Sequence, residues 1–400
     1  MAFQKEVSEI IHNLDEGLVK GGVLQEDNCF ELTSDQDSAI RLIKQWYSQR
    51  GTFAWKPYYV LSGAAGTGKS SLIQYIIKNL GVSESECLCT AFTGKATLNM
   101  NRTGNYSSTL HSSLYEYEKR TENGEPEFRL KSWVPFKLIV VDEASMISQE
   151  MFDDILSFMI PTIFIGDHCQ LPPIDGKFNI MLDPDFTLTK IMRQAKESPI
   201  IRASQLAIQG KPIPFCKMKG FQKIRKEDLD ESHLLWADQI VVGTNASRKA
   251  LNEVIREIKG YDSPIPAPGE RMIVLQNNRK YGVFNGQIIY LEEQPFFMQR
   301  NQAWSSYFLD ELEKSDPLMA IVGGKRQITF KVSDPPRNVL PNKEIVYLDY
   351  GYAISCHKSQ GSGWEKVLVM DEGFGWDEDT KRRWLYTAIT RAKKEILIVK

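Results

Sequence analysis

The chain has 400 residues, of which 49 are Lys or Arg and 51 are Asp or Glu, so its formal net charge is −2. This balance argues against a protein that coats nucleic acid through overall positive charge, but it allows a local basic groove. The content of 42% hydrophobic and 25% charged residues is typical of a globular protein, and the length predicts about two or three domains.

The cysteines and the N-terminus indicate a reducing compartment. The six cysteines show no CxxC pair and no regular spacing, so we expect reduced thiols rather than a zinc site or a disulfide framework. No apolar run approaches the ~18 residues that a membrane span requires. The first residues have no signal-peptide core and are too acidic for a transit peptide. We therefore predict a cytoplasmic protein, in the host cytoplasm if the source is viral, without a membrane partner.

The first predicted elements are helices. Apolar residues recur at helical spacing over residues 3–19, and a glycine pair follows them. Ser34 and Asp35 then supply the start of a second helix.

Strand-like apolar runs alternate with helical segments along the rest of the chain. The runs span residues 58–62, 87–91, 138–141, 162–165, 239–243, 367–370 and 396–399. Continuous Val, Ile and Leu strands between helices are typical of parallel sheets covered on both faces. The pattern predicts an α/β fold with two similar halves.

Two stretches interrupt this alternation. Residues 113–136 contain aromatic-rich runs on either side of Asn123-Gly124, which predicts a β-hairpin inside an α/β unit. Residues 261–345 are rich in Pro and Gly and contain short strand-like runs near 271–275, 287–291 and 327–332. They predict a small β-rich insert.

The segment from Gly63 to Ser70 has the spacing GxxxxGK[ST] between a predicted strand and a predicted helix. Glycines at these places let backbone N–H groups approach phosphate oxygens, and the helix N-terminus adds positive potential. Lys69 should reach the β- and γ-phosphates, and the Ser70 hydroxyl should ligate Mg²⁺. The expected nucleotide-binding residues of this loop are Gly63, Ala64, Ala65, Gly66, Thr67, Gly68, Lys69, Ser70 and Ser71.

A later strand ends in two carboxylates, Asp142 and Glu143, at the edge where α/β sheets bind ligands. Asp142 suits Mg²⁺ coordination, directly or through water. Glu143 is placed to polarise the water that attacks a γ-phosphate. Together with the phosphate-binding loop, these acids predict hydrolysis of a nucleoside triphosphate.

Further motifs follow one another along the chain. They are Leu32-Thr-Ser-Asp-Gln36, Thr90-Ala-Phe-Thr-Gly-Lys-Ala96, Ser108-Thr-Leu-His-Ser112, Gly166-Asp-His-Cys-Gln-Leu-Pro-Pro173, Leu188-Thr-Lys-Ile-Met-Arg-Gln194, Tyr352-Ala-Ile-Ser-Cys-His-Lys-Ser-Gln-Gly-Ser362 and Tyr386-Thr-Ala-Ile-Thr-Arg-Ala392. In content and order they resemble the motifs of superfamily 1 helicases of the 5′→3′ branch, specifically the RecD/Dda-like group. The resemblance runs from Leu32 to the C-terminus and is weakest over residues 261–345.

This resemblance implies an α/β architecture of two RecA-like P-loop lobes, each a parallel sheet flanked by helices. The implied limits are an N-terminal helical segment at 1–33, a first lobe at 34–185 with the hairpin insert 113–136, a second lobe at 186–260 and 346–400, and an SH3-like β-rich insert at 261–345.

The resemblance also implies roles around bound ATP. Gln36 would contact the adenine edge and Gln170 would sense the γ-phosphate, while Gln360 and Gly361 would close over the nucleotide. Arg193 and Arg391, on the lobe opposite Lys69, would act as arginine fingers. Outside such motifs, a surface salt bridge would be the better explanation of either arginine. The expected catalytic set is Lys69, Glu143, Gln170, Arg193 and Arg391.

A track for single-stranded DNA needs phosphate donors and flat faces for bases. The resemblance assigns to it Phe92, Thr93, Lys95 and His111 on the first lobe and Thr244, Asn245, His357 and Lys358 on the second. Phe92 stands where the family commonly has Pro, and it could stack on a base or fill the core. No metal-ligand spacing surrounds either histidine, so we reject a metal role for them.

Two features leave alternatives open. By position the 113–136 hairpin matches a strand-separating pin, whose aromatics are Tyr115, Tyr117, Phe128 and Trp133; cross-strand aromatics also stabilise ordinary hairpins. Gly363 stands where family members often have Glu, so a ribose contact from this position is in doubt and ribose selectivity is open.

We therefore expect an ATP- and Mg²⁺-dependent monomeric DNA helicase that moves 5′→3′ on single-stranded DNA and unwinds forked duplex. Single-strand-binding, replication or recombination proteins are its expected partners. The alternatives are a DNA or RNA translocase or an RNA helicase on the same fold, and a non-hydrolysing nucleotide-dependent clamp or loader. The complete set of catalytic residues argues against the clamp.

Overall fold

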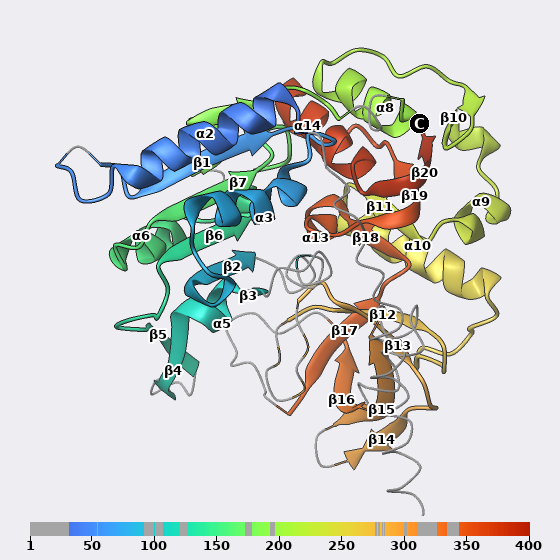
Figure 1. Ribbon diagram of the computed structural model, residues 1–400. Helices are drawn as coiled ribbons and strands as arrows, with labels where there is room; N and C mark the ends of the chain where they lie inside the picture. Colours follow the sequence, from blue (N-terminus) through green and yellow to red (C-terminus); the bar gives the residue numbers. More distant parts are fainter. Residues whose placement is uncertain are drawn as a thin grey trace, which may run out of the picture.

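The computed structural model describes residues 32–53, 55–91, 100, 107–120, 126–172, 178–192, 197–276, 278, 281, 283, 285–299, 302–310, 326–333 and 344–400. The predicted helix over residues 3–19 lies outside these residues. Figure 1 shows two α/β lobes side by side, with a barrel of strands next to the second lobe.

The first lobe is built on a parallel sheet with the strand order β3-β2-β6-β7-β1-β8. Alternate side chains of its buried strands point to opposite faces. Val140 therefore packs in the cluster that includes Ile43 and Leu72, whereas Ile139 packs with Ile155. The strands are β1 (Tyr58–Gly63), β2 (Cys87–Ala91), β3 (Ser107–Thr109), β6 (Leu138–Asp142), β7 (Thr162–Gly166) and β8 (Phe186–Leu188), and the covering helices are α2 (Ser34–Ser48), α3 (Lys69–Leu80) and α6 (Gln149–Ser157).

The second lobe has a sheet of order β18-β11-β19-β20-β10-β9, parallel except at the β10–β9 pair. One face packs on α8 and α14, through residues such as Ala203 and Trp384, and the other packs on α9 and α10. The elements are α8 (Pro199–Ile208), β9 (Lys217–Met218), β10 (Phe221–Ile224), α9 (Glu231–Trp236), β11 (Gln239–Val242), α10 (Asn245–Ile258), β18 (Ala353–Ser355), α13 (Cys356–Ser359), β19 (Trp364–Met370), α14 (Glu378–Ile389) and β20 (Ala392–Val399).

The two inserts are an antiparallel β-hairpin in the first lobe and a barrel in the second, whose strand pairs are antiparallel except for β16–β17. In the first lobe, α5 (Leu110–Leu114) leads into β4 (Tyr115–Arg120), which pairs with β5 (Pro126–Leu130). In the second, β12, β13, β15, β16 and β17 pair in a closed ring, and β14 extends it beside β15. These strands are β12 (Arg271–Val274), β13 (Ile288–Leu291), β14 (Phe296–Met298), β15 (Ala303–Asp310), β16 (Arg326–Val332) and β17 (Val346–Tyr350).

Buried ion pairs attach the barrel to α10 of the second lobe. Arg256 Nε lies 2.8 Å from Glu270 Oε1, and the Glu270 side chain has 0% exposure. Arg248 donates to Asp349 on β17, and Asn252 Nδ2 donates to Tyr350 O at 2.9 Å. Because such groups are costly to leave unpaired away from water, they fix the barrel's orientation on this helix.

The predicted fold class is confirmed, and each predicted strand of the two lobes is present. Two predicted boundaries move. The first-lobe sheet extends past residue 185, because β8 pairs with β1. The barrel extends past residue 345, because β17 pairs with β12 and β16. In the described part of the chain, no helix combines the length and apolar composition of a bilayer-crossing segment, and the described cysteines are free thiols.

Candidate active site

The phosphate-binding loop connects β1 to α3, in the predicted strand–loop–helix context. Gly66 and Gly68 have φ of 82° and 78°, the left-handed region that favours glycine. A Cβ at Gly68 would lie 2.6 Å from Gln36 Nε2 and 2.7 Å from Met192 Sδ. Gln36 and Met192 therefore pack closely against the loop at the point where α3 begins, and this packing leaves no room for a side chain at Gly68.

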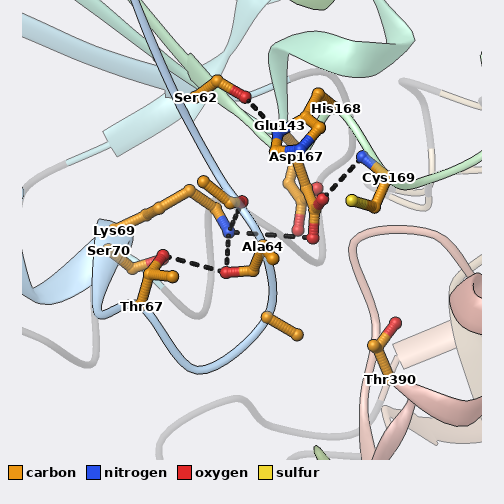
Figure 2. Close-up of polar contacts among 12 residues, drawn as sticks. Ser62, Ala64, Thr67, Lys69, Ser70, Glu143, Asp167, His168, Cys169 and Thr390 are labelled. Carbon is orange, nitrogen blue, oxygen red and sulfur yellow. Dashed lines mark hydrogen bonds and ion pairs between the residues drawn. The ribbon is translucent and has the colours of Figure 1, made fainter. Parts of the chain in front are cut away.

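Lys69, the first residue of α3, turns its ammonium back over the loop (Figure 2). Its Nζ donates to Gly63 O at 2.6 Å and to Ala64 O at 3.1 Å, and it lies 3.8 Å from Asp167 Oδ2. The positive charge is thus held where phosphate oxygens would bind, with backbone carbonyls as its partners in this structure.

The carboxyl end of β6 brings two acids to the same place. Asp142 Oδ2 accepts from Ser70 Oγ at 3.3 Å, and Asp142 Oδ1 accepts from the Glu143 N–H at 2.8 Å. Glu143 has φ of 52°, an unusual conformation for a non-glycine residue. This conformation changes the direction of the chain, and with it that of the Glu143 side chain, directly after β6. Burial raises the pKa of Asp142, and burial together with the Asp142 charge raises the pKa of Glu143.

The adjoining oxygens of Ser70 and Asp142 fit a magnesium ion. Mg²⁺ prefers oxygen donors and is held in nucleotide sites by one or two carboxylates, a hydroxyl and the phosphates. A dication there would also offset the cost of burying the Asp142 carboxylate.

Gln170 lies on the segment that follows β7. Its side chain is 5% exposed, and its Oε1 has no hydrogen-bond partner among the described residues. A buried amide oxygen without a partner is costly, and this one lies on the wall of the cleft between the lobes. It is therefore available to accept a hydrogen bond from a bound water or ligand.

The second lobe contributes Arg391 to the same cleft. Its guanidinium donates to the backbone oxygens of Thr387 at 3.0 Å and Ser362 at 3.1 Å, and to Thr390 Oγ1 at 3.0 Å. The positive charge of Arg391 lowers the pKa of Glu143 across the cleft. Burial has the stronger effect, so the pKa of Glu143 is raised overall. Arg391 of the second lobe and the phosphate-binding loop of the first therefore line the same cleft.

The cleft has a volume of about 360 Å³, which is within the usual range for a small-molecule site. Residues from both lobes line it: Ala65, Gly66, Gly68, Lys69, Ser70, Ser71, Asp142, Glu143, Asp167, Gln170, Met192, Thr390 and Arg391. The lining does not include three other residues of the loop, Gly63, Ala64 and Thr67. They contribute to the conformation of the loop, in which Thr67 Oγ1 donates to Ala64 O at 2.9 Å.

Two of the predicted nucleotide-contacting glutamines, Gln36 and Gln360, do not line the cleft. Gln36 has 0% exposure; its Nε2 donates to Thr67 O at 3.0 Å, and its Oε1 accepts from the Thr33 N–H at 2.9 Å. Gln360, which precedes Gly361, donates through Nε2 to Leu171 O at 3.0 Å. In this structure Gln36 thus supports the phosphate-binding loop. Gln360 of the second lobe bonds to Leu171 of the first lobe, the residue that follows Gln170.

Arg193 lies outside the described residues, but the segment before it is attached to the first lobe. Thr189 and Lys190 donate through their N–H groups to Asp35 Oδ2, each at 2.9 Å. The Met192 N–H donates to Gly66 O at 2.9 Å. The predicted start of the second lobe at residue 186 is therefore wrong for this segment.

The second-lobe residues of the predicted DNA track come together at one edge of the sheet. Thr244 and Asn245 follow β11, and His357 and Lys358 follow β18; these two strands are adjacent and parallel, so the four residues meet at one sheet edge. Thr244 Oγ1 accepts from the Ser247 N–H at 3.0 Å as the N-cap of α10. Burial lowers the pKa of His357, so its ring is a neutral group near pH 7.

The first-lobe part of the predicted track is less fully described. Phe92, Thr93 and Lys95 lie outside the described residues, and of His111 only the backbone in α5 is described. The two alternatives for Phe92 therefore stay open.

The predicted hairpin aromatics are not at its tip. Tyr115 begins β4 and donates through Oη to Asp154 Oδ2 of α6 at 2.5 Å, so it anchors the hairpin base. Tyr117 is opposite Phe128 within the ladder. Trp133 follows β5 and is 72% exposed. The tip, residues 121–125, lies outside the described residues and contains no aromatic residue.

Asp167, His168 and Cys169 form a cluster that could in principle ligate a metal, with ligand atoms within 4.8 Å of one another. Two of the three have other partners: Asp167 faces Lys69, and His168 Nδ1 lies 2.7 Å from Ser62 Oγ (Figure 2). Burial also raises the pKa of the Cys169 thiol to about 12, which disfavours the thiolate that metals require. We assign no metal to this cluster.

Sequence reasoning missed Asp167 and Tyr386 as members of the site. Tyr386 Oη donates to Asp167 Oδ2 at 2.7 Å and accepts from the Ala65 N–H at 2.6 Å. Both residues lie within motifs that the sequence displays, so their place in those motifs was the available signal.

Comparison with known proteins gives two family matches. Residues 44–228 match an AAA domain, and residues 350–399 match a UvrD-like helicase C-terminal domain. Among solved structures, a Pif1 of Bacteroides bound to single-stranded DNA is similar, with a TM-score of 0.55, 18% identity and 92% of each chain covered. This likeness supports the two-lobe fold.

Two curated relatives are similar in sequence. The ATP-dependent RecD2 DNA helicase of Deinococcus radiodurans is 28% identical over 367 residues, which cover 84% of this chain and 46% of that protein. The ATP-dependent DNA helicase dda of Enterobacteria phage T4 is 27% identical over 262 residues, 57% of each chain. The chain therefore spans less than two thirds of the length of these relatives.

Proposed function

We propose that this chain, a member of the RecD/Pif1-like helicases of superfamily 1B, is an ATP-dependent DNA helicase that moves 5′→3′ on single-stranded DNA. The observation that most directly supports this function is the shared cleft. Lys69 of one lobe and Arg391 of the other line the same 360 Å³ space. Hydrolysis of ATP in that space can therefore change the position of one lobe relative to the other.

The residues of the cleft have complementary roles in hydrolysis. Lys69 binds the β- and γ-phosphates in place of its present carbonyl partners, and Glu143 polarises the attacking water, which Gln170 orients through its free amide oxygen. Ser70 and Asp142 would hold Mg²⁺, which would supply charge neutralisation at the phosphate oxygens. Arg391 adds positive charge from the second lobe as the transition state develops.

Movement follows from the alternation of two states of the cleft. ATP binding favours the closed arrangement because phosphate oxygens contact groups of both lobes, and hydrolysis removes that preference. The second-lobe groups Thr244, Asn245, His357 and Lys358 then move relative to those of the first lobe. The barrel, held on α10 by Arg256 and Glu270, moves with the second lobe and grips the strand.

The rival functions differ in their dependence on nucleic acid. A helicase or translocase for RNA would use the same cleft with a different track, and a clamp would bind ATP without turnover. The relatives' names support DNA: RecD2 and dda are each named a DNA helicase.

We expect single-stranded DNA to stimulate steady-state ATP hydrolysis at least tenfold, because the two lobes form both the cleft and the track. Single-stranded RNA of the same length and sequence should stimulate it less. Turnover that is absent with saturating DNA would favour the clamp, and stronger stimulation by RNA would favour an RNA helicase. A stimulation that is equal for both would reject DNA selectivity.

A further inference from the structure

Tyr386 lies on α14 of the second lobe and reaches into the first. It is 1% exposed, and its hydroxyl contacts two separate segments there. Its Oη accepts from the Ala65 N–H at 2.6 Å and donates to Asp167 Oδ2 at 2.7 Å. One hydroxyl therefore links α14 to the phosphate-binding loop and to the loop that follows β7.

Both partners of this hydroxyl belong to the catalytic cleft. Ala65 and Asp167 line it, and Asp167 Oδ2 is also 3.8 Å from Lys69 Nζ. Backbone N–H groups of such loops are the groups that cradle phosphates. In this structure a second-lobe side chain therefore satisfies a backbone amide of the phosphate-binding loop.

The hydroxyl keeps its proton under ordinary conditions. Burial and the neighbouring Asp167 raise the pKa of Tyr386 well above its usual range. Tyr386 Oη therefore donates to Asp167 Oδ2 in a buried hydrogen bond, and bonds from a hydroxyl to a carboxylate are among the stronger hydrogen bonds in proteins. A phenylalanine would fill the same space and lack both bonds.

Two further side chains of α14 also bond to the loop that follows β7. Thr387 Oγ1 accepts from the Leu171 N–H at 3.0 Å, and Arg383 donates to His168 O. These contacts are to the segment containing Asp167 and Gln170, whereas Tyr386 also contacts the phosphate-binding loop.

From this geometry we infer that Tyr386 is a positioning residue that couples occupancy of the phosphate site to the closure of the two lobes, an inference that rests on the proposed ATPase function. An incoming triphosphate competes with Oη for the Ala65 N–H and draws Lys69 away from Asp167. The Tyr386–Asp167 bond then remains to hold α14 against the loop that carries Gln170. Tyr386 thus opposes the binding of ATP to the free protein and promotes the turnover of bound ATP.

The test is the substitution Tyr386→Phe. The matched control is Tyr59→Phe, which removes the hydroxyl of another buried tyrosine, in the core of the first lobe. We expect Tyr386→Phe to bind ATP about fivefold more tightly without DNA, because one competing hydrogen bond of ~1 kcal/mol is lost. Its kcat with saturating single-stranded DNA should fall about tenfold or more. Tyr59→Phe should change neither quantity by more than twofold.

These outcomes separate the inference from the function on which it depends. A wild-type protein without DNA-stimulated ATPase activity would contradict the proposed function. An active wild type with Tyr386→Phe indistinguishable from Tyr59→Phe would overturn the inference alone. A loss of thermal stability without opposite changes in ATP affinity and kcat would mean that Tyr386 is only structural.

Hydrogen exchange gives a second measurement that needs no variant. In the nucleotide-free wild type, the Ala65 amide should exchange slowly, since it donates to a buried oxygen. Exchange at the rate of an unprotected amide would overturn the inference even if Tyr386→Phe failed to fold.

Discussion

Lys69→Ala should reduce ATP hydrolysis by at least about 100-fold, the effect of removing one preorganised charge from a transition-state site. The Lys69 ammonium is 2.6 Å from Gly63 O and 3.8 Å from Asp167 Oδ2, so it already stands over the loop that binds phosphate. Alanine retains the helical start of α3 but removes the charge. The measurement is the steady-state rate of phosphate release with saturating single-stranded DNA.

The matched control for this substitution is Lys78→Ala in the last turn of the same helix, where the lysine is exposed. It should retain the wild-type rate. Thermal unfolding of both variants separates a catalytic loss from misfolding. A Lys69→Ala variant that folds and hydrolyses ATP within twofold of the wild type would refute the assignment of the whole site.

Glu143→Gln should lower kcat about 10²- to 10⁴-fold, the range for loss of a residue that activates water. The amide has the same shape as the carboxylate but cannot take a proton, so ATP binding should change little. Because hydrolysis is blocked after binding, the affinity for single-stranded DNA in ATP should match that measured with a non-hydrolysable analogue.

The control here is Glu150→Gln, in the exposed first turn of α6. It should leave kcat and the KM for ATP within twofold of the wild type. If Glu143→Gln lowered kcat less than tenfold, another group would have to activate the water. A large rise in KM with unchanged kcat would instead indicate that Glu143 serves nucleotide binding.

The sequence was sufficient to predict elements whose signal is local. The continuous apolar run at 138–141 corresponds to β6. Gly66 and Gly68 of the phosphate-binding loop lie between β1 and α3, and Lys69 begins α3, as their spacing predicts. The placement of Asp142 beside Ser70 also follows from topology, because the carboxyl ends of parallel strands share one edge.

The missed features depend on contacts between distant parts of the chain. Tyr386 bonds to Ala65, 321 residues away, and no spacing rule relates the two. The pairings that add β8 to the first-lobe sheet and β17 to the barrel are likewise non-local. Gln36 is different, since Thr33-x-x-Gln36 is a capping-box pattern and its bond to Thr33 was predictable.

The central claim is that ATP turnover between the lobes drives movement along single-stranded DNA in one direction. The most direct test compares unwinding of a partial duplex with a 5′ single-stranded tail and of the same duplex with a 3′ tail, with ATP present or omitted. We predict strand separation of the 5′-tailed duplex only, and only with ATP. Unwinding of neither substrate, of the 3′-tailed duplex, or without ATP would contradict the account.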